Sequence, residues 1–132
     1  MDATAALADL TEISSQIEAA VVVGPDGSVL AATTDDAARS ERIARTGTAL
    51  LDAAAERLGA GRSVTQVEAA LRSGSVFALR DAERGIVATT TASPTSGLVF
   101  YDLKTCLRSL AAEPAPKAKP RRRRPAKKET DA

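Results

Sequence analysis

Residues 19–34, AAVVVGPDGSVLAATT, constrain the fold of this chain more than any other segment. Two runs of small and β-branched residues, 20–23 and 29–33, flank the turn sequence Pro25-Asp26-Gly27. Asp-Gly is a strong hairpin signal because glycine adopts positive φ without a Cβ clash. The three valines of the first run do not alternate with polar residues, which is typical of a strand covered on both faces. We therefore expect a β-hairpin whose first strand lies inside a sheet with helices above and below it.

Residues 3–16 predict an amphipathic helix before the hairpin. Apolar residues recur there at i, i+4, i+7 and i+11, which places them on one helical face. Asp2 or Thr4 can cap the first turn, because a short oxygen-bearing side chain accepts from the free N–H groups there. The expected buried stripe comprises Ala6, Leu10, Ile13 and Ile17.

A longer helix is expected at residues 37–58, with Thr34, Asp35 and Asp36 as caps. Its apolar band is wider than one sheet contact uses, so two neighbours are implied. Gly47 lies mid-helix at a cost of about 1 kcal/mol relative to alanine. Together with the alanines around it, Gly47 favours the close approach of another helix; a small-residue face lying on the chain's own sheet is the alternative.

The second half of the chain predicts three more strands and a last helix. Residues 63–71, SVTQVEAAL, alternate apolar and polar side chains and carry polar groups in mid-strand, as a sheet edge does. Strands at 76–79 and 86–91 follow across two turns, and helical spacing continues from 98 to about 112. The expected fold is of the α/β class (α+β type): a five-stranded antiparallel sheet flanked by helices on both faces, in the order α-β-β-α-β-β-β-α.

Charge divides the chain into an acidic domain and a basic tail. Residues 1–112 carry ten Lys/Arg and fourteen Asp/Glu, whereas residues 113–132 carry eight and three, so the net charges are −4 and +5. Four prolines in the tail forbid regular helix, and little apolar surface is left there to offset the entropy of ordering. We expect one folded domain at 1–112 and a disordered tail at 113–132.

Candidate catalytic groups are scarce. The sequence has no histidine, one cysteine and no G-x-x-x-x-G-K-[ST] phosphate loop. Cys106 falls on the inward stripe of the last helix, where a thiol behaves as a small hydrophobe. The pair Asp35-Asp36 and the hydroxyl-rich residues 89–96 are explained by helix capping and a strand end, with Thr95 or Ser96 as cap. We expect no enzymatic activity, no cofactor and no metal. The single cysteine and the absence of a leader-like apolar run favour a cytoplasmic protein.

In element order and local pattern, the chain resembles the roadblock family of dynein-light-chain-like domains, in particular bacterial regulators of Ras-like GTPases. The likeness covers about residues 5–112 and rests on several strings occurring in order. They are the first helix leading into AAVVVGPDGSVLAAT, the small-residue second helix, SVTQVEAALRSGSVFAL, and TSGLVFYDLKTCLRSL. A profilin-like or PAS-like ligand sensor shares this layered order, but a core so poor in aromatic residues offers little to line a pocket.

The resemblance implies a homodimer that acts as a platform for a small Ras-like GTPase. The strand at 63–71 would pair with its copy, and the second helices would lie against one another. This arrangement would satisfy both the polar edge strand and the wide apolar band through one two-fold surface. The expected interface comprises Ala44, Gly47, Leu51, Ala54, Val64, Gln66, Val67 and Glu68.

The tail is not part of the roadblock pattern, and its sequence is compatible with several kinds of partner. Its cations can neutralise phosphates of nucleic acid without reading sequence, since no aromatic residues are interleaved. An anionic membrane, the acidic face of a partner protein and a purely solubilising role are the alternatives. A dimer that binds nucleic acid through its tail is thus the second functional hypothesis. The expected anion-binding residues are Lys117, Lys119, Arg121, Arg122, Arg123, Arg124, Lys127 and Lys128.

Overall fold

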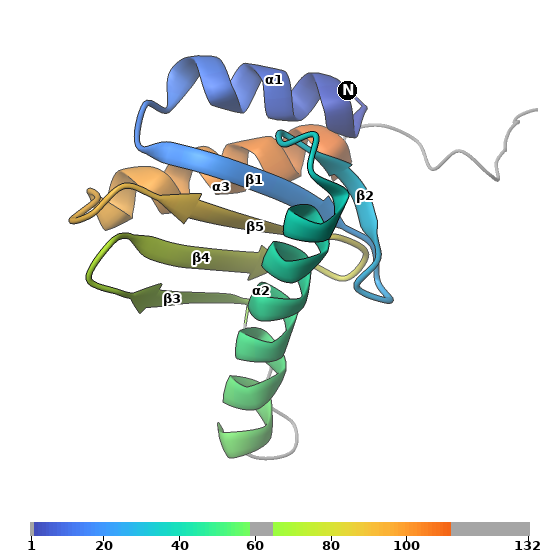
Figure 1. Cartoon of the computed structure of the whole chain (residues 1–132). Coiled ribbons are helices and arrows are strands. Elements are labelled where there is room, and N and C mark those ends of the chain that lie inside the picture. The colour runs from blue at the N-terminus through green and yellow to red at the C-terminus, as the bar shows by residue number, and fades with distance from the viewer. Residues whose placement is uncertain (1, 59–64, 112–132) are drawn as a thin grey trace, which may run out of the picture.

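The computed structural model describes residues 2–58 and 65–111 of the chain (Figure 1). Five strands form one antiparallel sheet in the order β2-β1-β5-β4-β3, and three helices pack against it. The fold class and element order expected from the sequence are confirmed. The elements are α1 (Ala3–Ile13), β1 (Ile17–Val23), β2 (Val29–Ala32), α2 (Ala37–Leu58), β3 (Gln66–Ala70), β4 (Ser75–Arg80), β5 (Gly85–Thr90) and α3 (Ser96–Ala111).

The helices divide between the two faces of the sheet. In Figure 1, α1 and α3 lie together on one face, whereas α2 runs across the strands on the other. Each face carries its own apolar cluster: Val22 and Phe77 pack under α1 and α3, and Val21 and Val87 pack under α2. Because β1 lies between β2 and β5 and its valines are almost fully buried, the expected two-sided burial of this strand is confirmed. The turn at Gly27 has φ +84°, the positive value that favours glycine.

The first helix is shorter than its apolar periodicity predicts. The Asp2 carboxylate accepts a hydrogen bond from the Ala5 N–H at 2.8 Å and caps the helix as expected. The helix ends at Ile13, so the predicted stripe is wrong at its C-terminal end. Ile13 is 61% exposed, and Ile17 opens β1 and reaches the same apolar cluster from the sheet. Ser14 takes an extended conformation as the C-cap, which interrupts the periodicity.

The long helix α2 has the predicted bounds, and Asp36 accepts from the Arg39 N–H at its first turn. The expectation that another helix approaches α2 closely at Gly47 is wrong. A Cβ built at Gly47 would lie 2.4 Å from a methyl carbon of Val87, so the missing side chain lets α2 lie directly on β5. The alternative, a small-residue face on the chain's own sheet, is the arrangement that the structure adopts at this point.

We predict that Gly47→Ala destabilises the fold despite the better helix propensity of alanine. Overpacking costs about 1–3 kcal/mol and the better helix propensity of alanine contributes about 1 kcal/mol, so a net loss of up to about 2 kcal/mol is expected. Urea unfolding followed by circular dichroism measures this loss. In the double variant Gly47→Ala/Val87→Ala the clash is relieved. Its loss in free energy of unfolding should therefore be smaller than the sum of the two single-variant losses, by about 1 kcal/mol or more. Additive losses would contradict the contact.

Candidate protein interface at the β3 edge

The outer strand β3 leaves a row of backbone groups without partners in the sheet. Leu71 and Gly74 exchange N–H···O bonds, and the Arg80 N–H donates to the Thr65 carbonyl at 2.9 Å. Hydrogen-bonded pairs alternate along an antiparallel ladder, so the odd-numbered residues of β3 bond to β4. The even-numbered residues, Gln66, Glu68 and Ala70, therefore direct their N–H and C=O groups to the open edge.

The side chains of β3 divide between the two layers of helices. Val67 packs into the cluster beneath α2. Glu68 lies on the opposite face, where its carboxylate accepts a hydrogen bond from the Ser96 hydroxyl of α3 at 2.8 Å. Gln66 and Ala70 are exposed at the two ends of the strand. The edge strand is thus held by both layers while its outer backbone stays accessible.

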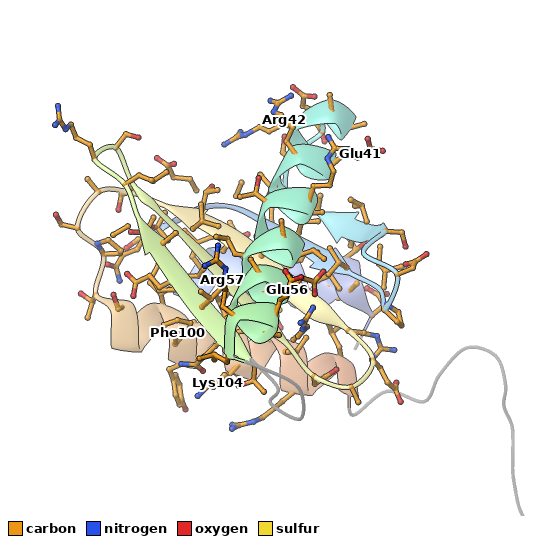
Figure 2. All side chains as sticks on the ribbon, turned by 90° about the horizontal axis from the view of Figure 1, so that it is seen from below. Glu41, Arg42, Glu56, Arg57, Phe100 and Lys104 are labelled. Atoms are coloured by element: carbon orange, nitrogen blue, oxygen red, sulfur yellow. The ribbon has the colours of Figure 1, made fainter. Side chains whose placement is uncertain are left out.

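Helix α2 extends past this edge. Figure 1 shows its C-terminal turns projecting beyond β3, and Figure 2 places Glu56 and Arg57 at the opposite end of the helix from Glu41 and Arg42. The fully buried residues of α2 stop at Leu51, Ala54 and Ala55 are half-buried, and Leu58 is 55% exposed. An apolar ledge, formed by Ala54, Ala55 and Leu58, therefore overhangs the row of outward backbone groups.

The predicted interface residues fall into three groups. Ala44, Gly47 and Leu51 are buried against the chain's own sheet, where they position α2. Ala54, Gln66, Val67 and Glu68 lie on or beside the edge, whereas Val64 is outside the described residues. Sequence reasoning missed Leu58 and Ala70. An overhanging helix would have indicated Leu58, but the length of α2 relative to the sheet is visible only in three dimensions.

A second surface feature of α2 is a row of exposed cations. Arg39, Arg42 and Arg45 recur at i, i+3 and i+6, and all three are exposed. Residues with this spacing share one helical face. The row belongs to the N-terminal half of α2, away from the ledge.

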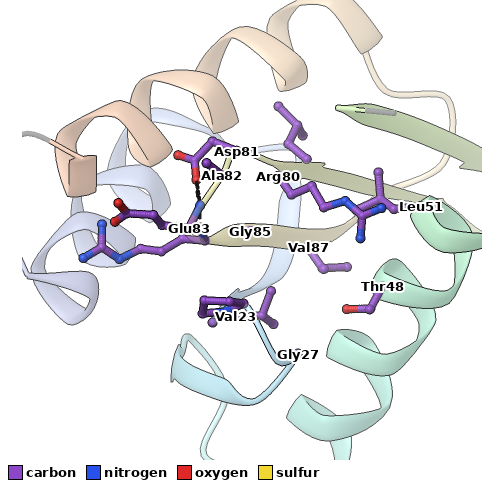
Figure 3. Close-up of a pocket in the computed structure, with 14 residues that line it drawn as sticks. Val23, Gly27, Thr48, Leu51, Arg80, Asp81, Ala82, Glu83, Gly85 and Val87 are labelled. Atoms are coloured by element: carbon purple, nitrogen blue, oxygen red, sulfur yellow. Dashed lines mark hydrogen bonds between the residues drawn. The ribbon is translucent and has the colours of Figure 1, made fainter. Parts of the chain in front are cut away.

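A pocket of about 250 Å³ lies where the hairpin turn, α2 and the β4–β5 turn meet (Figure 3). Three of its charged lining residues make structural contacts. Arg80 pairs with Asp52 at 2.7 Å, Arg84 donates to the Leu110 carbonyl at 3.2 Å, and Asp81 accepts the backbone N–H groups of its own turn. The carboxylate of Glu83, which also lines the pocket, is exposed.

Cys106, on α3, is 6% exposed and belongs to the apolar cluster that α1 and α3 cover. Burial raises the pKa of its thiol to about 11, and the negative charge of Asp9 acts in the same direction. A nucleophilic cysteine needs the opposite environment, one that stabilises the thiolate. Within residues 2–58 and 65–111, no cluster of three His, Cys, Asp or Glu side chains is able to hold a metal ion.

We predict that Cys106 reacts slowly with iodoacetamide at pH 8. A pKa of about 11, against the ordinary 9.0, lowers the thiolate fraction about a hundredfold. Because burial raises the pKa of the thiol, the reactive thiolate becomes more abundant as the pH rises towards 11. The reaction rate should therefore increase with pH over this range. Mass spectrometry of timed samples measures the rate, and the urea-unfolded chain is the control. Equal rates in the folded and unfolded chains would contradict this assignment.

The predicted anion-binding residues of the tail, which fall within 117–128, lie outside the described residues. Among the helices that the structure describes, none is long and apolar enough to span a membrane.

Comparison with solved structures gives the architecture its name. A Roadblock/LC7 domain from Streptomyces avermitilis superposes with a TM-score of 0.70, covering 80% of this chain and 91% of its own, at 19% identity. This chain has the Roadblock/LC7 fold. The roadblock resemblance noted in the sequence is thereby confirmed as a likeness of fold.

Two further solved structures, one roadblock-like and one profilin, superpose with TM-scores of 0.66 and 0.56. Myxococcus xanthus MglB gives a TM-score of 0.66 at 15% identity, covering 83% of this chain and 92% of its own. Profilin from Schizosaccharomyces pombe gives 0.56 at 14% identity, covering 84% and 98%. No family profile matches the sequence, and no curated protein matches it. The Roadblock assignment therefore rests on three-dimensional similarity at low identity.

Proposed function

We propose that this chain is a non-catalytic, homodimeric scaffold that binds a small Ras-like GTPase and modulates its state. The observation that carries the proposal is the open β3 edge beneath the overhanging ledge of α2. The Roadblock fold supports it, because the resemblance of the sequence to bacterial roadblock regulators implies this role. The raised pKa of the Cys106 thiol, about 11, fits a structural role for that residue.

In the proposed dimer, β3 pairs antiparallel with its copy and joins two sheets into one. The outward N–H and C=O groups of Gln66, Glu68 and Ala70 supply the ladder. The ledge of each α2, with Leu58 at its end, then covers the neighbouring subunit. Burying a leucine fully is worth about 1.5–3 kcal/mol, and two-fold symmetry counts each contact twice. Ala44, Gly47 and Leu51 support this surface from beneath by seating α2 on the sheet.

We predict that Gln66→Pro dissociates the dimer and leaves the monomer folded. Gln66 is exposed, and its N–H faces outward, so proline removes a donor from the partner's ladder but none from β4. Two lost hydrogen bonds per dimer amount to about 2 kcal/mol, or about 30-fold in dissociation constant. Analytical ultracentrifugation across a concentration series measures this change.

The matched control is Val67→Pro, one residue along. Its N–H points inward to β4, so this change should lower the free energy of unfolding by at least about 1 kcal/mol. If folded Gln66→Pro keeps the dissociation constant of the native dimer, or if the native chain is monomeric throughout the series, the proposed surface is wrong.

A partner GTPase would supply its own nucleotide site, since the sequence has no phosphate loop. Modulation would then act by positioning groups of the GTPase. The exposed row Arg39, Arg42 and Arg45 offers cations to an acidic switch region or to a developing phosphate charge. We propose that the chain binds its GTPase in the cytoplasm, the compartment that the single cysteine favours.

The GTPase partner is tested by affinity capture with the full chain, followed by reconstitution with the purified candidate. We expect a protein with a phosphate loop that binds differently in its GDP and GTP-analogue states, and no GTP hydrolysis by this chain alone. Arg42→Gln should weaken binding, whereas Arg57→Gln, on the same helix but next to the ledge, is the charge-matched control. Binding to no GTPase in either state would refute this part of the proposal.

A further inference from the structure

A groove of about 240 Å³ runs between α1 and α3 on the face of the sheet opposite α2. Its apolar floor includes Leu10 and Cys106, and Ile13, 61% exposed, lies at its margin. Its charged lining is of one sign: Asp9 and Glu12 come from α1 and Asp102 comes from α3, with no lysine or arginine among the lining residues. The groove is therefore both apolar and acidic.

Asp102 is the unusual member of this set. The residue as a whole is 7% exposed, and it lines the groove. Within residues 2–58 and 65–111, no hydrogen bond or ion pair engages its carboxylate. The nearby hydroxyls are committed elsewhere, since Thr105 donates to the Tyr101 carbonyl and Ser109 donates to the Cys106 carbonyl. The carboxylate of Asp102 can therefore accept charge-assisted hydrogen bonds from a cation that enters the groove.

The basic tail of the same chain supplies such cations next to the groove. Helix α3 ends at Ala111, and residues 113–132 carry a net charge of +5. Along the helix, Asp102 lies about 14 Å from Ala111 at ~1.5 Å per residue. Arg121 is ten residues beyond Ala111 and can extend up to about 35 Å from it. The Arg121–Arg124 run is thus long enough to fold back along α3 and reach Asp102.

We propose that residues 113–132 dock intramolecularly in this acidic groove, with arginines of the 121–124 run pairing with Asp102, Asp9 and Glu12. The apolar floor accepts the aliphatic stems of these side chains while the heads meet the carboxylates. Docking uses the cations of the tail within the molecule, so it competes with any phosphate-bearing partner of the tail. The proposal is independent of the dimer and of the GTPase.

Paramagnetic relaxation in the full chain tests the docking. A nitroxide is attached at Ala126→Cys in a Cys106→Ala background, and amide intensities are compared before and after reduction of the label. We expect intensity losses confined to residues of α1 and α3 that flank the groove, and none along α2. The losses should vanish in about 0.5 M NaCl, where the Debye length is about 4 Å.

Variants separate the groove from general attraction between tail and domain. Asp9→Asn/Glu12→Gln changes two exposed residues and should fold normally, and Asp102→Asn removes the buried charge; both should abolish or strongly reduce the losses. Glu41→Gln/Glu56→Gln removes the same charge from α2 and should leave them intact. Losses that persist in Asp9→Asn/Glu12→Gln, or that are absent from the native groove, would overturn the proposal.

The intramolecular form is tested by mixing isotope-labelled chains without nitroxide with unlabelled chains that carry it. Losses in the groove of the isotope-labelled chain would show that the tail of a second copy docks there, and would overturn the proposal in its intramolecular form. Unchanged intensities in the mixture, with losses in the singly tagged chain, support it.

Discussion

The pairing of β1 with β5 is the contact on which the rest of the molecule depends. The two strands are joined along six registered pairs, and both are buried on both faces. Apart from Phe77 on the neighbouring strand β4, which is fully buried, the sheet relies on close contact of small and branched aliphatic residues with the helices on either side. Gly47 shows how close this contact is, because α2 leaves no room for even a methyl group above Val87.

Covering both faces of the sheet directs interaction to its rim. Helices occupy the two broad surfaces, so a partner has access to an open strand edge, the overhanging end of α2, the exposed arginines and the groove between α1 and α3. The β3 edge with its ledge, and the groove between α1 and α3, each combine polar groups with apolar surface. This combination suits association with protein segments.

Local chemistry in the sequence predicted most of the fold. Asp-Gly at the hairpin, Asp2 and Asp36 as caps, and the polar alternation in β3 each act over a few residues, and each is found where expected. The prediction failed where the answer depended on what lies opposite a residue. Ile13 keeps the helical spacing although Ser14 ends the helix, and Gly47 indicates a close neighbour without saying which one. The candidate interface was partly predictable for the same reason: strand polarity indicated the edge, but only the assembled fold separates Ala44 and Leu51, which seat the helix, from Leu58, which extends past it.

The hydrogen bond between Ser96 and Glu68 has a consequence for the edge strand. A strand that slips by one residue turns every side chain to the opposite face. Here such a slip would carry Glu68 away from α3 and drive Val67 out of its apolar contacts. The bond thus pins the register of β3 from a different layer of the molecule. Because the register is fixed, any second strand that pairs with this edge meets the backbone donors and acceptors in the same order.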